Sequence, residues 1–251
     1  MPSLKRKLQN TDARLTGTVC TIPSATVTQA IAASGVDMVI IDLEHGAVDY
    51  ASAHAMIAAT AGTECAPLVR VAENNEVQVK RALDLGAEGI VFPLINSAGD
   101  AERAVASLRY PPRGNRGFGP FLAQSRWQTS LPAYKADIED QLVCCLLIET
   151  VEAIANIDDI CTVEGVDFAV LAPFDLSTSL GISGQFGHPD FLAAQEKVEQ
   201  AAKRAGLPLG GNALAKEQAD ALIAKGYRMI GGFDILWLRQ KAAELTSWAL
   251  E

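Results

Sequence analysis

The chain has 251 residues, of which 49% are hydrophobic and 20% are charged, a composition typical of a globular protein. Its net charge of −9 argues against a nucleic-acid or anionic-membrane surface, because those partners attract clustered lysine and arginine. No apolar run suits a signal peptide or a membrane span, and the five cysteines lack zinc-ligand spacing. We therefore expect a cytoplasmic protein without nucleic-acid or membrane partners.

Short apolar runs recur along the chain and predict β-strands that are buried on both faces. They alternate with Ala-rich segments of helical spacing, and glycines mark where several of these helices end. Such alternation indicates a parallel sheet covered by helices. The predicted strands span residues 15–21, 37–43, 67–72, 88–94, 142–149, 167–172, 207–211 and 228–233.

Eight strand–helix units in about 250 residues fit one (β/α)8 TIM barrel, so we expect residues 1–251 to form a single domain. A doubly wound open sheet is the alternative, since the strand edges are not sharply marked. Residues 110–140, which include YPPRGNRGFGP, interrupt the alternation. We expect an extended loop with a short helix there.

Charged side chains stand at the predicted carboxyl ends of several strands, where barrel enzymes carry their active sites. Carboxylates from neighbouring strand ends suit a hard divalent ion such as Mg²⁺ or Mn²⁺ and leave positions open for a substrate. No lysine ends a strand, so Schiff-base chemistry has no candidate residue. The charged residues are Asp42, Glu44 and His45 after the second strand, Arg70 in the third, Glu149 at the end of the fifth and Asp175 after the sixth.

Several motifs, taken in chain order, resemble those of the class II pyruvate aldolases of the HpcH/HpaI group. This resemblance extends over nearly the whole chain. It implies a TIM barrel with a carboxy-terminal helix exchanged between subunits, assembled as a homohexamer, a trimer of dimers. It also implies metal-dependent cleavage of 4-hydroxy-2-oxo acids to pyruvate and an aldehyde. The motifs are IDLEHG, PLVRV, YPPRGNRGFG, LLIETVEAIANIDDI, VEGVDFAVLAPFDLSTSLG and HP.

The resemblance also assigns roles to residues of this chain. Glu149 and Asp175 are the expected ligands of a divalent Mg²⁺, Mn²⁺ or Co²⁺ ion. His45 matches the residue that acts as the base in this family and would work with Asp42. Arg70 would stabilise the enolate that forms from the 2-oxo acid. An Asp42–His45 contact requires the chain to turn at Glu44, because strand alternation puts these side chains on opposite faces.

Further residues are expected around these groups. Asp84, an acid in the last turn of a helix, would raise the basicity of the histidine. The turn that contains Ala172 and Phe174 would meet the substrate carboxylate together with Asp175, and Asn212 would line the site. Glu44 is expected to support the site from behind the substrate-binding groups.

The chain departs from the family pattern at a few positions near the expected site. Leu147 replaces a common glutamine, Ala172 a glycine and Phe174 an alanine, and Asn212 stands in a less apolar lining. These changes suggest a smaller or more polar donor or aldehyde, such as hydroxypyruvate with a hydroxylated aldehyde.

Two alternatives stay open. The first is an acyl-CoA lyase of the citramalyl- or malyl-CoA type, although the basic residues near a CoA entrance are limited to Arg113, Arg116 and Arg126. The second is a barrel that has lost its chemistry. The joint presence of His45 and Arg70 with the two expected metal ligands argues against that reading.

Overall fold

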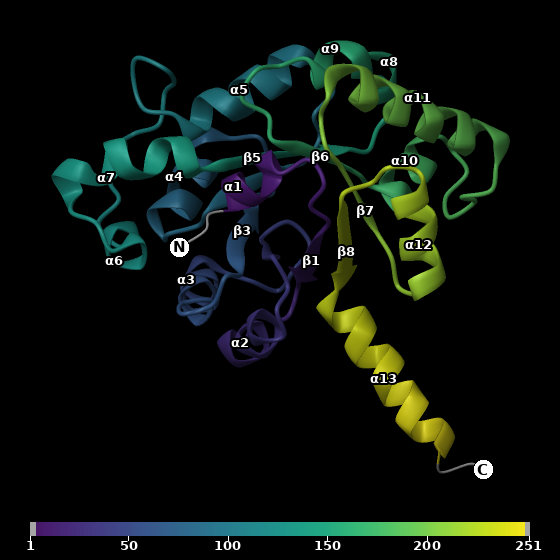
Figure 1. The fold of residues 1–251 in the computed structure, drawn as a ribbon, viewed down its shortest axis with the longest axis horizontal. Helices are drawn as coiled ribbons and strands as arrows, with labels where there is room; N and C mark the ends of the chain where they lie inside the picture. The colour runs from purple at the N-terminus through teal and green to yellow at the C-terminus, as the bar shows by residue number, and fades with distance from the viewer. Residues whose placement is uncertain (1–3, 249–251) are drawn as a thin grey trace.

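Eight parallel strands form a closed barrel in the computed structural model, which describes residues 4–248. The strands follow one another in chain order, and β8 pairs with β1 to close the barrel (Figure 1). This closure confirms the TIM barrel and excludes the open sheet. The strands are β1 (Leu15–Cys20), β2 (Met38–Asp42), β3 (Ala66–Arg70), β4 (Gly89–Phe92), β5 (Val143–Ile148), β6 (Phe168–Leu171), β7 (Leu209–Asn212) and β8 (Met229–Phe233).

Helices connect the strands and surround the barrel. Several begin at a residue whose side chain accepts a hydrogen bond from a first-turn N–H, as Ser24, Asp49 and Ser97 do. The helices are α1 (Leu4–Gln9), α2 (Ala25–Ala33), α3 (Tyr50–Ala59), α4 (Glu76–Asp84), α5 (Ala98–Leu108), α6 (Ala123–Trp127), α7 (Leu131–Ile138), α8 (Val151–Ala155), α9 (Ile157–Cys161), α10 (Pro173–Ser179), α11 (Pro189–Ala205), α12 (Lys216–Ala224) and α13 (Asp234–Trp248), with a 3₁₀ turn over Glu139–Gln141.

Residues 110–140 contain more helix than the sequence predicted. In place of one short helix, the segment holds α6 and α7 and runs into the 3₁₀ turn. Gln128 ends α6 in the left-handed region at φ 54°, and a proline occupies the first turn of α7. Helices of five and eight residues contain too few turns to show a clear hydrophobic period, which explains the difference.

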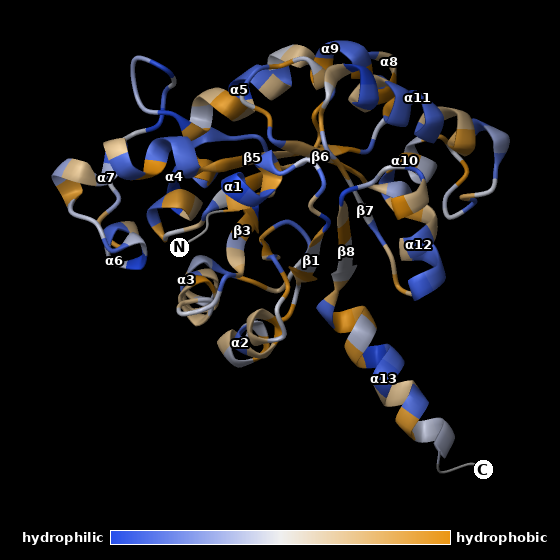
Figure 2. Cartoon of the chain, in the orientation of Figure 1, coloured by the Kyte–Doolittle hydropathy of each residue, from blue (hydrophilic) through white to orange (hydrophobic). Residues whose placement is uncertain are grey.

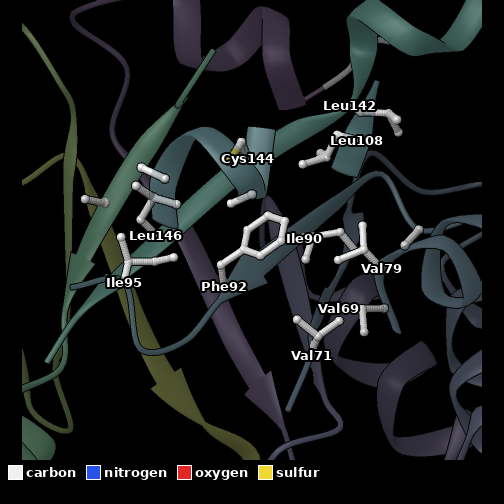
Figure 3. Packing of buried hydrophobic residues seen from close by; sticks show 14 of the residues in the cluster. Val69, Val71, Val79, Ile90, Phe92, Ile95, Leu108, Leu142, Cys144 and Leu146 are labelled. Atoms are coloured by element: carbon white, nitrogen blue, oxygen red, sulfur yellow. The ribbon is translucent and has the colours of Figure 1, made fainter. Parts of the chain in front are cut away.

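The barrel strands are buried on both faces, so the core has two layers. Outward-facing side chains such as Val69 and Phe92 pack beneath the helices (Figure 3). Inward-facing side chains such as Leu68 and Phe168 fill the lumen, and α1 adds Leu4 to this inner layer. Because apolar side chains complete the barrel from within, the carboxyl ends of the strands are available for polar groups.

The last helix, α13, extends away from the barrel (Figure 1). Asp234 is buried, whereas Leu238, Leu245 and Trp248 are exposed, and Figure 2 shows apolar bands along the helix. The expected exchange of this helix between subunits stays a prediction, because a single chain does not test it. No helix within residues 4–248 is long and apolar enough to cross a membrane.

Candidate active site

Asp42 and Arg70 form a buried ion pair between neighbouring strand ends. The two residues are register partners in β2 and β3. Arg70 donates from Nε to Asp42 Oδ1 at 2.8 Å and from Nη2 to Oδ2 at 2.6 Å. Burial alone would raise the pKa of Asp42, but the hydrogen bonds and charge of Arg70 outweigh it and hold the pKa below its usual value. The guanidinium is therefore fixed in one orientation.

The chain turns directly after β2, as the sequence predicted. Asp42 Oδ1 accepts hydrogen bonds from the backbone N–H of Glu44 at 3.0 Å and of His45 at 3.2 Å. Gly46 permits this turn, because a Cβ there would lie 2.4 Å from the Asp42 carbonyl oxygen. Asp42 thus contacts the backbone of His45, while the imidazole is 67% exposed and lies 3.8 Å from a carboxylate oxygen of Glu44.

Glu44 stands between Arg70 and His45. Its Oε2 atom lies 3.3 Å from Nη1 of Arg70, yet this buried oxygen has no hydrogen-bond partner. Burial raises the pKa of Glu44 despite the opposing charge of Arg70. One guanidinium therefore faces two carboxylates, and only the bonds to Asp42 are well formed.

Glu149 and Asp175, the two expected metal ligands, come from the loops that follow β5 and β6. Glu149 is 6% exposed, and its Oε1 accepts a hydrogen bond from the Leu94 N–H at 2.5 Å. Burial raises the pKa of Glu149, and the negative charges of Asp175 and Glu44 add to this effect. Asp175 lies in the first turn of α10. The two carboxylates are therefore close enough to repel each other.

The charges at this end of the barrel do not balance. Among the described residues here, Asp42, Glu44 and Glu149 lie near the guanidinium of Arg70, and Asp175 lies near Glu44 and Glu149. Within residues 4–248 no group of three or more His, Cys, Asp or Glu is arranged to hold a metal ion. The fitting set is instead a pair of carboxylates, hard oxygen donors that would leave coordination positions open for a substrate.

Asp84 lies apart from this group within the chain. Its Oδ1 accepts a 2.8 Å hydrogen bond from Arg116, whose buried guanidinium lies 4.7 Å from the centre of the Tyr110 ring. Burial raises the pKa of Asp84 against the effect of Arg116. No hydrogen bond or ion pair between Asp84 and His45 is found in the described part of the chain, so its action on the histidine stays a prediction.

The three arginines considered for a CoA entrance are each engaged elsewhere. Arg116 bonds to Asp84, and Arg126 donates to the Thr60 hydroxyl at 3.1 Å. Arg113 pairs with Glu139 and with Asp140. Each of the three guanidinium groups therefore already has at least one partner within the chain.

A cavity of about 550 Å³ opens beside the charged group. It reaches from the barrel lumen, where Leu147 lines it, to the loops after β6, β7 and β8. Its volume is within the range of small-molecule sites. All the residues that the sequence predicted to bind substrate line this cavity, namely Arg70, Ala172, Phe174, Asp175 and Asn212.

Sequence reasoning missed three apolar residues at the mouth of the cavity. Phe186, Leu214 and Leu236 line the cavity and are partly exposed. They lie in loops or at a helix start, where apolar residues follow no regular period. Their position after strand ends was the one available signal.

Comparison with known proteins decides the family. Residues 20–240 match the model of the HpcH/HpaI aldolase/citrate lyase family. The chain belongs to that family. A pyruvate aldolase from Rhizobium etli is 38% identical over 82% of this chain and 80% of its own length. The 2-dehydro-3,6-dideoxy-6-sulfogluconate aldolase of Pseudomonas putida is 34% identical over 91% of this chain and 90% of its own length.

A solved structure supports the same assignment. An HpcH/HpaI aldolase/citrate lyase family protein from Burkholderia cenocepacia superimposes with a TM-score of 0.93. It is 30% identical in sequence and covers 99% of both chains. The barrel and its loops are therefore those of the HpcH/HpaI fold over nearly their full length.

Proposed function

We propose that this protein is a divalent-metal-dependent aldolase that reversibly cleaves 4-hydroxy-2-oxo acids to a 2-oxo acid, pyruvate or hydroxypyruvate, and an aldehyde. The observation that carries the proposal is the excess of carboxylates around Arg70 at the carboxyl end of an HpcH/HpaI barrel. Such an excess is costly in an empty site and is compensated when a cation binds.

Glu149 and Asp175 are the residues that would hold the metal. When bound, a divalent ion acts as a Lewis acid that stabilises the negative charge of an enolate. Glu149 is fixed for this role by the Leu94 N–H, which occupies one of its two oxygens. Mg²⁺, Mn²⁺ and Co²⁺ all accept carboxylate oxygens, so the donor set does not distinguish among them.

Arg70 and His45 divide the remaining work. Arg70 is held by Asp42, and its permanent charge would stabilise the oxygen on which the enolate charge develops. In cleavage, the bond between C3 and C4 breaks, the C4 hydroxyl loses a proton and C3 gains one. The exposed imidazole of His45 is suited to move these protons directly or through water. Backbone groups at Phe174 and Asp175 would orient the substrate carboxylate.

The proposal includes assembly into a homo-oligomer, a hexamer built as a trimer of dimers. The exposed apolar residues of α13 support it, because an isolated chain leaves Leu238, Leu245 and Trp248 in water. Exchange of α13 between copies would bury these side chains.

A cleavage assay tests the proposed function. The purified protein is stripped with EDTA, and cleavage of a 4-hydroxy-2-oxo acid or of oxaloacetate is followed before and after Mg²⁺, Mn²⁺ or Co²⁺ is restored. We expect activity to vanish with EDTA and to return with metal. Absence of activity with every metal would reject the aldolase and redirect the assay to acyl-CoA thioesters. In the synthetic direction, a strong preference for pyruvate over hydroxypyruvate would settle the donor.

A further inference from the structure

The mouth of the cavity has two unlike sides. The end of β3 and the loops after β2 and β5 carry charged groups that include Glu44, Arg70 and Glu149. The loops after β6, β7 and β8 carry the apolar rim, which we define as Phe174, Phe186, Leu214 and Leu236. Large exposed apolar side chains gathered around one opening are a mark of a binding surface.

An aromatic series anchors the rim to the core. Phe174 is 60% exposed, and its ring packs at a right angle to the Phe186 ring with a centroid distance of 5.0 Å. Phe186 in turn lies 5.5 Å from Phe191 in a tilted arrangement, and Phe191 is 4% exposed at the start of α11. Contacts of these kinds between rings are favourable and restrict how the rings turn. The exposed face of Phe174 is therefore a supported surface directly beside Asp175.

The cavity offers little to an anionic group. Among the described residues that line it, the cations are Arg70 and Lys225. In the proposed function Arg70, which is bonded to Asp42, serves the 2-oxo acid half of the substrate, and Lys225 lies 3.4 Å from a carboxylate oxygen of Glu199. Neither cation is therefore left to pair with a carboxylate or a sulfonate on the aldehyde half. A neutral apolar group needs no such partner and gains contact with the rings.

We propose that the apolar rim binds the aldehyde half of the substrate and selects aldehydes with an uncharged, branched or aromatic apolar tail. This inference rests on the proposed aldolase function and names its acceptor class. It also replaces the hydroxylated aldehyde suggested by the sequence, because Phe174, Phe186 and Leu214 present hydrocarbon to the cavity.

Two aldehydes of the same shape test the selection. 4-Methylpentanal ends in an isopropyl group where 4-oxobutanoate ends in a carboxylate. With saturating pyruvate and Mn²⁺, we expect kcat/KM to favour 4-methylpentanal by at least about tenfold. Preference for 4-oxobutanoate in the wild-type protein would overturn the proposal.

Two variants test whether the apolar rim causes the aldehyde preference. In Phe186→Ala we expect the ratio of the two kcat/KM values to fall about tenfold, and a ratio cancels any loss of active protein. Leu192→Ala is the control, since Leu192 is an exposed apolar residue of α11 outside the cavity lining, and its ratio should stay within about twofold of wild type. An unchanged ratio in Phe186→Ala would reject the rim as the subsite, as would a changed molar mass of that variant, which would place the ring between copies.

Deuterium incorporation at C3 of pyruvate separates this inference from the proposed function. Exchange needs enolate formation but no aldehyde. Metal-dependent exchange without the expected preference would overturn the acceptor class alone. Absence of exchange in the wild-type protein would reject the aldolase and the inference with it.

Discussion

Acidic residues lie at both ends of the barrel, but they are paired with cations differently at the two ends. At the amino end, Asp167 and Asp37 each lie 2.8 Å from a lysine of α1, and Glu88 accepts the Leu4 N–H at 2.6 Å. At the carboxyl end, Glu44 and Glu149 lie near the guanidinium of Arg70, which is already bonded to Asp42, and Asp175 adds a further negative charge beside them.

This difference in pairing indicates that acids at the amino end stabilise the fold and acids at the carboxyl end serve function. Acids at the amino end are paired within the chain, so they hold α1 against the barrel without any ligand. Acids at the carboxyl end remain in excess over the described cations beside them, and Glu149 lies among the like charges of Asp175 and Glu44. Barrel enzymes place catalysis at the carboxyl end and stability at the amino end. The charge pattern of this chain follows that division.

Removal of one carboxylate from the carboxyl end should have the largest effect. Glu149→Gln keeps the shape of the side chain and its contact with the Leu94 N–H, but removes an expected metal ligand. We expect kcat/KM for cleavage to fall by about 10³-fold. The metal-free variant should melt at a higher temperature than metal-free wild type, because a buried charge among like charges is gone. Activity above one tenth of wild type would contradict the assignment of Glu149 as a metal ligand.

The Asp42–Arg70 pair is a buried, balanced contact at the carboxyl end, so its loss should cost stability. Asp42→Asn leaves a mostly buried guanidinium without its main partner. We expect the free energy of unfolding at pH 7 to fall by about 3 kcal/mol, measured by urea denaturation. A change below about 0.5 kcal/mol would show that Glu44 compensates fully.

The pH dependence of that loss follows from the pKa of Asp42. Because the folded pKa lies below the usual value, the stabilisation is fully present above the unfolded pKa and is lost as the pH falls through the folded pKa. The wild type should therefore keep its advantage over Asp42→Asn at pH 5 and lose it progressively below about pH 4. An advantage that instead grows at low pH would contradict the assigned ionisation.

Replacement of an acid at the amino end should have the smallest effect on stability and should leave the cleavage rate unchanged. Asp167→Asn removes the ion pair with Lys5, while the Cys144 N–H still finds an oxygen acceptor. We expect a loss of about 1 kcal/mol, seen as a fall of about 2–4 °C in melting temperature. Cleavage rates should stay within about twofold of wild type. A large loss of activity would contradict the claim that acids at the amino end serve stability alone.

Strands and their polar ends were predictable from sequence because both are local. All eight predicted strands overlap the observed ones, and the turn after Asp42 follows from strand alternation once the family resemblance makes Asp42 and His45 work together. The Asp84–Arg116 bond was not predictable, since it joins residues 32 positions apart through an irregular loop. Three residues of the apolar rim, Phe186, Leu214 and Leu236, were missed because loops and helix starts carry no period.

Direct titration of Mn²⁺ into EDTA-stripped protein tests the central claim, that the unbalanced carboxylates form a cation site. Free Mn²⁺ is measured by electron paramagnetic resonance for wild type, Glu149→Gln and Asp167→Asn. The account predicts one bound ion per chain in wild type and in Asp167→Asn, with binding weakened by at least about tenfold in Glu149→Gln. Equal binding in wild type and Glu149→Gln, or none in wild type, would contradict it.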